Sequence, residues 1–316
     1  MTNNQNINPT FAEVVGQEKV KTTLSLYLEA YSNTGRIPFL NLTTQAGGGK
    51  SYMARLFRSG LKRPDGSTPP LLEINAASIK TAGQFFEQVY PVWIQNNAVL
   101  FLDEIHAAPK DLQDIFLSIL DVKKSPVRSV QWEDSHYDFD FNKISFISAT
   151  TNQEKLTVPL RDRLKDVSFQ PYKQRELLEI FENQLFPDIE FSMEAKQSII
   201  MCFRGNPRDA VVKADDIRMY CSAKGLKKVE LHHWKDFCHV MSVNPHGLTN
   251  SEMTIVRVLG QRTEMTLNGL ASATGFSRNA IQRDYESMLV RKNLMEINQK
   301  RRLSADGIRF YNQHAK

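Results

Sequence analysis

A glycine-rich stretch at residues 44–51, Thr-Gln-Ala-Gly-Gly-Gly-Lys-Ser, has the residue types that bind phosphate. Glycines let backbone N–H groups approach an anion without obstruction by Cβ, and the N-terminus of a following helix attracts negative charge. A lysine can then reach the outer phosphates, and a serine hydroxyl can hold Mg²⁺. The candidate nucleotide-binding residues are therefore Gly47, Gly48, Gly49, Lys50 and Ser51, with Ser51 also a metal ligand.

The surroundings of residues 44–51 fit a phosphate-binding loop. An apolar run at residues 39–42 precedes the loop and a helical pattern begins near Tyr52, so a strand, a loop and a helix follow in order. Thr44 stands where the usual pattern has its first glycine. A glycine-rich turn that only caps a helix is the alternative interpretation.

A pair of carboxylates further along the chain supports phosphate chemistry. Residues 98–102, Ala-Val-Leu-Phe-Leu, are typical of a buried strand in a parallel sheet, and they run directly into Asp103 and Glu104. Asp103 can hold the Mg²⁺ that Ser51 touches, while Glu104 can orient and polarise the water that attacks a γ-phosphate. An acidic pair after a strand can also cap a helix. Its position one strand–helix–strand unit after a Gly-Lys-Ser loop favours nucleotide hydrolysis.

The order of the predicted elements indicates an α/β domain followed by two smaller domains. Strands and helices alternate in residues 1–172, which predicts a parallel sheet with a ligand at the carboxyl ends of its strands. The pattern from residue 173 to about residue 238 is wholly helical, so we assign residues 173–246 to a helical lid. Residues 247–316 form the third predicted domain.

Within the first domain, residues 126–142 have the alternating pattern of a β-hairpin, with a turn-like segment at residues 133–136. Aromatic residues alternate along it, and large exposed apolar patches commonly mark partner sites. We therefore predict an exposed docking surface for a partner protein. The alternative is that these aromatic side chains pack on the first domain. They are Trp132, Tyr137, Phe139 and Phe141.

The last domain has the pattern of a winged helix. Helices are predicted at residues 253–259, 267–274 and 277–292, the last with Ser277 as its N-cap, and two short strands follow around a basic loop at residues 298–302. A helical dimerisation or packing domain is the alternative. The predicted DNA-binding residues are Arg278 and Arg283 on the third helix and Lys300, Arg301 and Arg302 in the wing.

The charge distribution agrees with a DNA-binding domain at this end of the chain. The net charge is +5, and residues 251–316 contain eleven Lys or Arg against six Asp or Glu, so the rest of the chain is balanced. A basic domain on a neutral remainder is the pattern expected for binding nucleic acid, although a solvated basic tail is the alternative.

Composition and cysteine usage indicate a cytoplasmic globular protein. Of the 316 residues, 41% are hydrophobic and 24% charged, and no apolar run approaches the ~20 residues of a membrane span. Cys202, Cys221 and Cys238 show no paired spacing and fit reduced thiols. The chain is long enough for two or three domains, and we expect no membrane partner.

Seven stretches together carry a family resemblance that extends from about residue 11 to residue 310. They are residues 15–18, 47–51, 102–106, 148–151, 159–163, 204–208 and 285–302. In these stretches the chain resembles a divergent member of the RuvB family, the hexameric AAA+ motors of Holliday junction branch migration. The resemblance implies an AAA+ P-loop NTPase fold with a helical lid and a winged helix. It also implies the use of ATP and Mg²⁺, assembly of copies into a hexameric ring, and duplex or four-way-junction DNA as the partner.

The resemblance also implies roles for individual residues. Thr151 matches a polar sensor near the γ-phosphate, Arg208 matches a second sensor on the lid, and Val15 joins the nucleotide-binding set. Arg163 matches the arginine finger that reaches into a neighbouring subunit's site, with Arg161 as the competing candidate. Such cations stabilise the negative charge that develops on the transferred phosphoryl group.

This chain departs from the family pattern at several positions. Thr44-Gln45-Ala46 replaces Gly-Pro-Pro, an Arg-Pro pair is missing before residue 15, and Ala107 stands where an arginine usually follows the histidine. The hairpin occupies the place where the family binds its junction-recognising partner, but its sequence is its own.

We predict an ATP-driven motor for branch migration in DNA recombination and repair. A clamp or helicase loader of DNA replication is one alternative, and a DNA-bound ATP switch or transcription regulator is the other.

Overall fold

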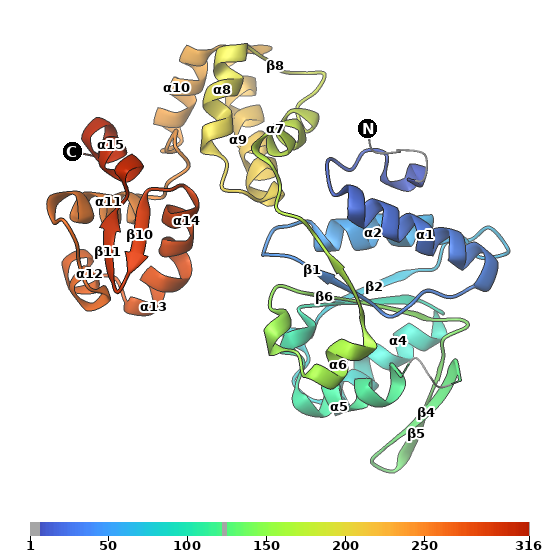
Figure 1. The fold of residues 1–316 in the computed structure, drawn as a ribbon. Helices are drawn as coiled ribbons and strands as arrows, with labels where there is room; N and C mark the ends of the chain where they lie inside the picture. The colour runs from blue at the N-terminus through green and yellow to red at the C-terminus, as the bar shows by residue number, and fades with distance from the viewer. Residues whose placement is uncertain (1–6, 122–124, 316) are drawn as a thin grey trace. The chain divides into compact units, whose positions relative to one another are not determined.

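The structure is a computed structural model that describes residues 7–121 and 125–315. The chain forms two compact units (Figure 1). The first runs to Ile180 and includes Gly205–Val212, and the second consists of Phe181–Arg204 and the chain from Lys213 onwards. Across the described ranges, no helix is both long and apolar enough to cross a membrane.

A five-stranded parallel sheet forms the centre of the first unit, in the order β2-β3-β6-β1-β7. This confirms the predicted α/β class. Strand β7 was not predicted, because its four residues include only one buried side chain, Val167. The strands are β1 (Leu40–Thr43), β2 (Leu71–Asn75), β3 (Val99–Asp103), β6 (Ser145–Thr150) and β7 (Lys165–Ser168).

Helices cover both faces of this sheet (Figure 1). Successive side chains of a strand point to opposite faces, so Phe146 joins one apolar core and Ile147 the other. The face of Ile147 packs against α1 (Glu18–Thr34) and α2 (Lys50–Gly60). Other helical segments of this unit are η2 (Pro9–Phe11), η3 (Ala76–Ser78), α3 (Ala82–Gln84), η4 (Phe85–Val89), α4 (Tyr90–Gln95), η5 (Ile105–Ala107), α5 (Lys110–Ile119), η6 (Gln153–Lys155) and α6 (Val158–Arg163).

The predicted β-hairpin is present. Strands β4 (Val127–Trp132) and β5 (Ser135–Asp140) pair antiparallel, with Trp132 opposite Ser135. The connection is shorter than predicted, because only Glu133 and Asp134 lie between the strands and Glu133 adopts a positive φ of 51°. The hairpin extends from the sheet beside α4 and α5 (Figure 1).

The predicted exposed aromatic surface on this hairpin is wrong. Phe139 is fully buried and Phe141 nearly so, and both belong to the core of the first unit. Tyr137 stacks on Phe86 of η4 with ring centroids 3.9 Å apart, and half-buried Trp132 lies on the same ring at 6.0 Å. Alternation along a strand pair showed a one-sided apolar face, but it could not show that η4 and α4 cover this face.

A buried arginine fastens the base of the hairpin to the sheet. The guanidinium of Arg128 lies over the rings of Phe39 and Phe141, 5.4 and 5.3 Å from their centroids. Its Nε donates to the carbonyl oxygen of Ser125 at 2.9 Å, and its Nη1 donates to that of Ile119. Burial lowers the pKa of Arg128. These bonds to backbone carbonyls connect β4 with the end of α5.

The part of the second unit that was predicted to be wholly helical contains a small parallel sheet as well. Strands β8 (Glu190–Phe191) and β9 (Lys228–Val229) pair there, and two residues per strand are too few to leave a periodic pattern. The helices of this region are α7 (Gln174–Asn183), which begins in the first unit, α8 (Met193–Cys202), α9 (Pro207–Lys224) and α10 (Leu231–Val240).

The C-terminal part of the second unit contains the predicted helices and strand pair. Ser277 caps the third helix by accepting the Ala280 N–H at 3.1 Å, as predicted. A π-helical turn interrupts this helix, and one more helix, α15, follows the wing. The elements are α11 (Asn250–Gln261), α12 (Leu267–Thr274), α13 (Arg278–Ala280), η7 (Ile281–Tyr285), α14 (Glu286–Arg291), β10 (Met295–Asn298), β11 (Lys300–Leu303) and α15 (Ala305–His314).

A partly buried ion pair joins α11 to the loop after α8. Glu252 is fully buried, and its carboxylate accepts two hydrogen bonds of 2.8 Å from the guanidinium of Arg204. Glu252 also accepts the N–H of Thr249, whose side chain caps the helix in return. Such bidentate, charge-assisted bonds fix the orientation of both partners.

The predicted basic loop of the wing is wrong, because β11 already begins at Lys300 and only Gln299 lies between the two strands. Each wing cation pairs with a carboxylate: Lys300 with Glu264 at 2.5 Å, and Arg301 with Glu286 and Arg302 with Glu296, both at 2.8 Å. Lys300 and Arg302 are exposed, whereas Arg301 is only 8% exposed. Arg301 is therefore removed from the predicted DNA contacts, because its side chain lies inside the domain.

Replacing Phe139 by Ala tests the burial of the hairpin. A fully buried Phe contributes both transfer free energy and packing, so we expect Phe139→Ala to lower the free energy of unfolding by about 3–5 kcal/mol. His136 lies on the same strand with an exposed side chain, and His136→Ala should change it by less than about 0.5 kcal/mol. Urea unfolding measures both values. Equal stability of the two variants would contradict the packing described above.

Candidate nucleotide-binding site

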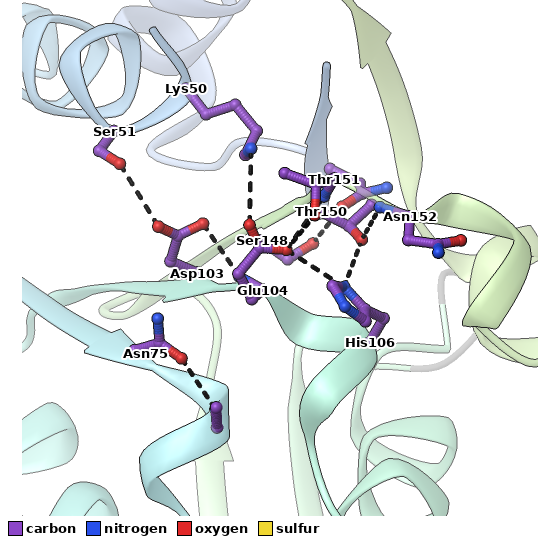
Figure 2. A network of polar contacts seen from close by, with 12 residues as sticks. Lys50, Ser51, Asn75, Asp103, Glu104, His106, Ser148, Thr150, Thr151 and Asn152 are labelled. Atoms are coloured by element: carbon purple, nitrogen blue, oxygen red, sulfur yellow. Dashed lines mark hydrogen bonds and ion pairs between the residues drawn. The ribbon is translucent and has the colours of Figure 1, made fainter. Parts of the chain in front are cut away.

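The site lies at the carboxyl edge of the parallel sheet. Strands β3, β6 and β1 are neighbours, so the segments that follow them meet at this edge. The phosphate-binding loop follows β1. Asp103 ends β3 and Glu104 comes directly after it, while Thr150 ends β6 and Thr151 comes directly after it. Figure 2 shows the polar network that these segments form.

The loop conformation explains its three glycines and shows how Thr44 fits beside them. Gly47 and Gly49 have φ of +75° and +93°, the left-handed region that favours glycine. A Cβ on Gly48 would lie 2.5 Å from Cγ2 of Thr44. The threonine at the unusual position thus fills space that the missing side chain of Gly48 leaves, and the Gly48 N–H donates to the Gln45 carbonyl at 3.1 Å.

Lys50 begins helix α2, and its side chain is directed into the site. It is 6% exposed, and its Nζ lies 3.8 Å from Oε1 of Glu104. A buried ammonium group needs a negative partner, and this carboxylate provides one in the described structure. The same position suits a cation that contacts the outer phosphates of a nucleotide.

Ser51 and Asp103 supply oxygen atoms suited to a magnesium ion. The Ser51 hydroxyl lies 3.5 Å from Oδ2 of Asp103, whose Oδ1 accepts the Glu104 N–H at 2.9 Å. Burial raises the pKa of Asp103, and the charge of Lys50 opposes this shift. Hydroxyl and carboxylate oxygens are the ligands that Mg²⁺ prefers, so the two predicted metal ligands fit the ion chemically.

Glu104 lies between β3 and β6 in an uncommon backbone conformation. Its φ is +52°, and such left-handed non-glycine residues often occur at functional sites. Its Oε2 accepts hydrogen bonds from the Thr151 N–H at 3.0 Å and from the Thr151 hydroxyl at 2.8 Å. The structure therefore brings these two predicted catalytic residues into direct contact.

Two residues of this network were not assigned a role from the sequence. His106 Nδ1 lies 2.8 Å from the hydroxyl of Thr150 and 3.2 Å from Oε2 of Glu104 (Figure 2). A histidine shortly after the acidic pair and a hydroxyl residue at the end of the next strand were visible signals. Only the parallel pairing of β3 with β6 shows that they meet.

The start of helix α9 lies against the phosphate-binding loop. The Arg208 N–H donates to the Gly47 carbonyl at 3.3 Å, and a Cβ on Gly47 would lie 2.9 Å from Oδ1 of Asn206. The structure thus brings the backbone of Arg208 to the loop, while its side chain is exposed. Asn206 also accepts the Asp209 N–H at 2.9 Å, a contact with no earlier prediction.

The stretch that follows Val15 is hydrogen-bonded to the segment that brings Tyr172 near the loop. Val15 is half-buried, and Gln17 two residues later pairs its amide with the backbone of Gln170 at 2.7 and 2.9 Å. Tyr172 follows, with its hydroxyl oxygen 3.7 Å from the position of a Cβ on Gly49. Burial raises the pKa of Tyr172 to about 12, so the phenol is neutral at pH 7. Sequence reasoning missed Gln17 and Tyr172.

The two candidate finger residues lie on α6, away from this network. Arg163 is half-buried, and its Nη1 donates to the Pro159 carbonyl at 2.9 Å, whereas Arg161 is exposed. In residues 7–121 and 125–315, neither arginine forms a hydrogen bond or ion pair with the phosphate-binding loop. The described subunit alone therefore does not bring a finger to its own site.

The predicted DNA-binding residues of the third helix lie in the second unit and are exposed. Arg283 belongs to the π-helical turn η7, and Arg278 donates to Oδ1 of Asn268 at 3.4 Å. Lys300 and Arg302 are on the exposed side of the wing. These four cations remain predictions for phosphate contacts.

Comparison with known proteins agrees with this geometry. The family model described as Holliday junction DNA helicase RuvB P-loop domain matches residues 7–168, just over half of the chain. The chain is 24% identical to the Holliday junction branch migration complex subunit RuvB of Mycoplasma genitalium over 310 residues, which cover 96% of each protein. The corresponding subunit of Lactobacillus johnsonii is 23% identical over 291 residues, 90% of this chain and 84% of that protein.

A solved structure shares the fold. The Thermotoga maritima RuvB Holliday junction branch migration motor superimposes with a TM-score of 0.74 at 21% identity, covering 96% of this chain and 97% of that one. The fold likeness covers nearly the whole chain, as does the resemblance seen in the sequence, whereas the family model matches the first half. This chain belongs to the RuvB family of AAA+ P-loop ATPases.

Proposed function

We propose that this protein is an ATP-driven DNA motor that moves four-way junctions. The observation that carries the proposal is the convergence of Lys50, Ser51, Asp103 and Glu104 at one edge of the sheet. Family membership supports it, since the relatives of Mycoplasma and Lactobacillus are named as subunits of a Holliday junction branch migration complex. ATP is the proposed substrate.

The chain's own residues divide the work of hydrolysis. The glycines of the loop and Lys50 would bind the phosphates of ATP, and Val15 and Arg208 complete the proposed nucleotide-binding set. Ser51 and Asp103 would hold Mg²⁺, which supplies neutralising charge to phosphate oxygens when bound. Glu104 would orient the attacking water, and Thr151 holds its carboxylate by two hydrogen bonds. Positioning and electrostatic stabilisation account for most of phosphoryl-transfer catalysis.

We further propose a ring of identical subunits, six in number as in the family resemblance, with a cytoplasmic location. The ring is supported by the arginines on α6, which do not contact the subunit's own loop. The three cysteines are buried thiols, which fits a reducing compartment. A junction-recognising partner would meet the polar outer side of hairpin 126–142, because the aromatic side is packed on the first unit.

Replacing Lys50 and replacing Glu104 should each stop the motor, but at different steps. We expect Lys50→Ala to weaken ATP binding and Glu104→Gln to bind ATP but hydrolyse it roughly 10²–10⁴-fold more slowly, because the water is no longer activated. The measurements are ATP affinity, ATP turnover and ATP-dependent separation of a four-way junction. Lys19→Ala and Glu154→Gln are matched controls, since both side chains are exposed. Wild-type turnover by Glu104→Gln would contradict the proposed site, and turnover without junction separation under any condition would favour the loader.

Mixing two inactive variants tests the shared site. If Arg163 completes the site of a neighbouring subunit, Arg163→Ala should lose about 10³-fold or more in turnover, as in other fingers supplied in trans. Mixed with Lys50→Ala, it should regain part of the activity, because some interfaces then combine an intact loop with an intact finger. Arg161→Ala is the comparison. If Arg161→Ala, and not Arg163→Ala, loses turnover and regains part of it when mixed with Lys50→Ala, then Arg161 is the finger. Full activity of a strictly monomeric sample would contradict a site shared between subunits.

The salt dependence of DNA binding tests the exposed cations of the second unit. Each phosphate contact contributes about 0.9 to the slope of log affinity against log salt, so the double replacement of Lys300 and Arg302 by Ala should flatten it by up to about two units. Arg309→Ala is the control, because this exposed arginine lies on α15 outside the proposed contacts. A motor that passes over every sequence should bind unrelated duplexes equally. Strong preference for one duplex sequence would favour the transcription regulator.

A further inference from the structure

The two carboxylate oxygens of Glu104 have different surroundings. Oε2 lies 3.0 Å from the backbone nitrogen of Thr151, 2.8 Å from its hydroxyl, and 3.2 Å from Nδ1 of His106. Oε1 lies 3.8 Å from Nζ of Lys50. One oxygen is therefore held by three polar atoms, while the other is directed toward the lysine of the phosphate-binding loop (Figure 2).

The contacts of His106 determine which of its ring nitrogens carries hydrogen. Nδ1 faces two oxygen atoms, the carboxylate Oε2 of Glu104 and the hydroxyl of Thr150. A bare Nδ1 would direct its lone pair toward the carboxylate oxygen and be repelled by it, whereas an Nδ1–H can donate to the Thr150 hydroxyl while its positive hydrogen lies near the carboxylate. We assign the hydrogen to Nδ1 on this basis, so that His106 turns the positive end of an N–H group toward Oε2 of Glu104, 3.2 Å away.

Thr150 holds the imidazole in place. Its side chain is fully buried at the end of β6, and its hydroxyl oxygen accepts the Asn152 N–H at 3.0 Å while lying 2.8 Å from Nδ1. The imidazole itself is only 14% exposed. A fixed hydroxyl thus orients His106, and His106 contacts the carboxylate from a second direction, since both other donors belong to Thr151.

We propose that His106 is a positioning residue for ATP hydrolysis. It fixes Oε2 of Glu104, so that Oε1 is the oxygen that orients the attacking water. This inference rests on the ATPase function proposed above. The physical reason is that a carboxylate held by donors from one residue can still turn, and a misplacement of about 1 Å can cost on the order of 10²-fold in rate.

Replacement of His106 by three different side chains tests this role. His106→Ala should lower kcat by about 10- to 100-fold, because Glu104 loses its second contact. The KM for ATP and the affinity for a fluorescent ATP analogue should change little, since the loop and Lys50 are untouched. His106→Asn should restore most of kcat, because the amide nitrogen of Asn can take the place of Nδ1. His106→Gln should not, because its amide nitrogen reaches the place of Nε2. A purely structural role would not separate Asn from Gln.

Three further variants complete the experiment. Thr150→Val removes the hydroxyl that orients the imidazole and should lower kcat in the same way, whereas Ala107→Ser at the exposed neighbouring position should not. His106→Ala should add no further loss to Glu104→Gln if it acts through that carboxylate. Thermal unfolding measures whether each variant is folded. If His106→Ala does not fold, the comparison of His106→Asn with His106→Gln, together with Thr150→Val, still tests the role.

The outcomes distinguish this inference from the function on which it rests. Wild-type kcat for His106→Ala, or equal restoration by Asn and Gln, would overturn the positioning role while Glu104→Gln remained inactive. Additive losses in the double variant would also overturn it. Wild-type turnover by Glu104→Gln would instead show that the proposed hydrolytic site itself is wrong.

Discussion

The parallel pairing of β1, β3 and β6 is the constraint on which the site depends. Ser148 lies beside both Asn41 of β1 and Leu102 of β3, so the three strands reach the same edge together. If β6 shifted by one residue against its neighbours, the side chain of Thr150 would point to the opposite face of the sheet. Two separate apolar cores hold the register, because the strands are buried on both faces.

Much of the site could be predicted because its parts are local in the sequence. The loop glycines, Lys50 and the Asp103-Glu104 pair each carry their chemistry within a few residues of a strand end. His106 could not be recognised in this way, since its partner Thr150 is 44 residues distant along the chain. The contact exists only because β3 pairs with β6.

The wrong predictions for the hairpin aromatics and for Arg301 share one physical origin. Aromatic residues on the hairpin and basic residues on the wing were interpreted as surface because their own segments did not provide partners. In the folded protein, Tyr137 stacks on Phe86 and Arg301 pairs with Glu286, and both partners lie on other segments of the chain. The last domain does carry the net positive charge of the chain, but most of its carboxylates already pair with lysine or arginine. A count of charges shows the sum and not which cations face solvent.

The packing of the hairpin gives the molecule a built-in optical probe. Trp93 and Trp234 are almost completely buried, one in each unit, whereas Trp132 at the end of β4 is half-buried against Phe86. Of the three indoles, Trp132 is therefore the one that a dissolved quencher reaches most readily. The part of the fluorescence that such a quencher removes therefore reports mainly on the hairpin, without any label attached to the protein.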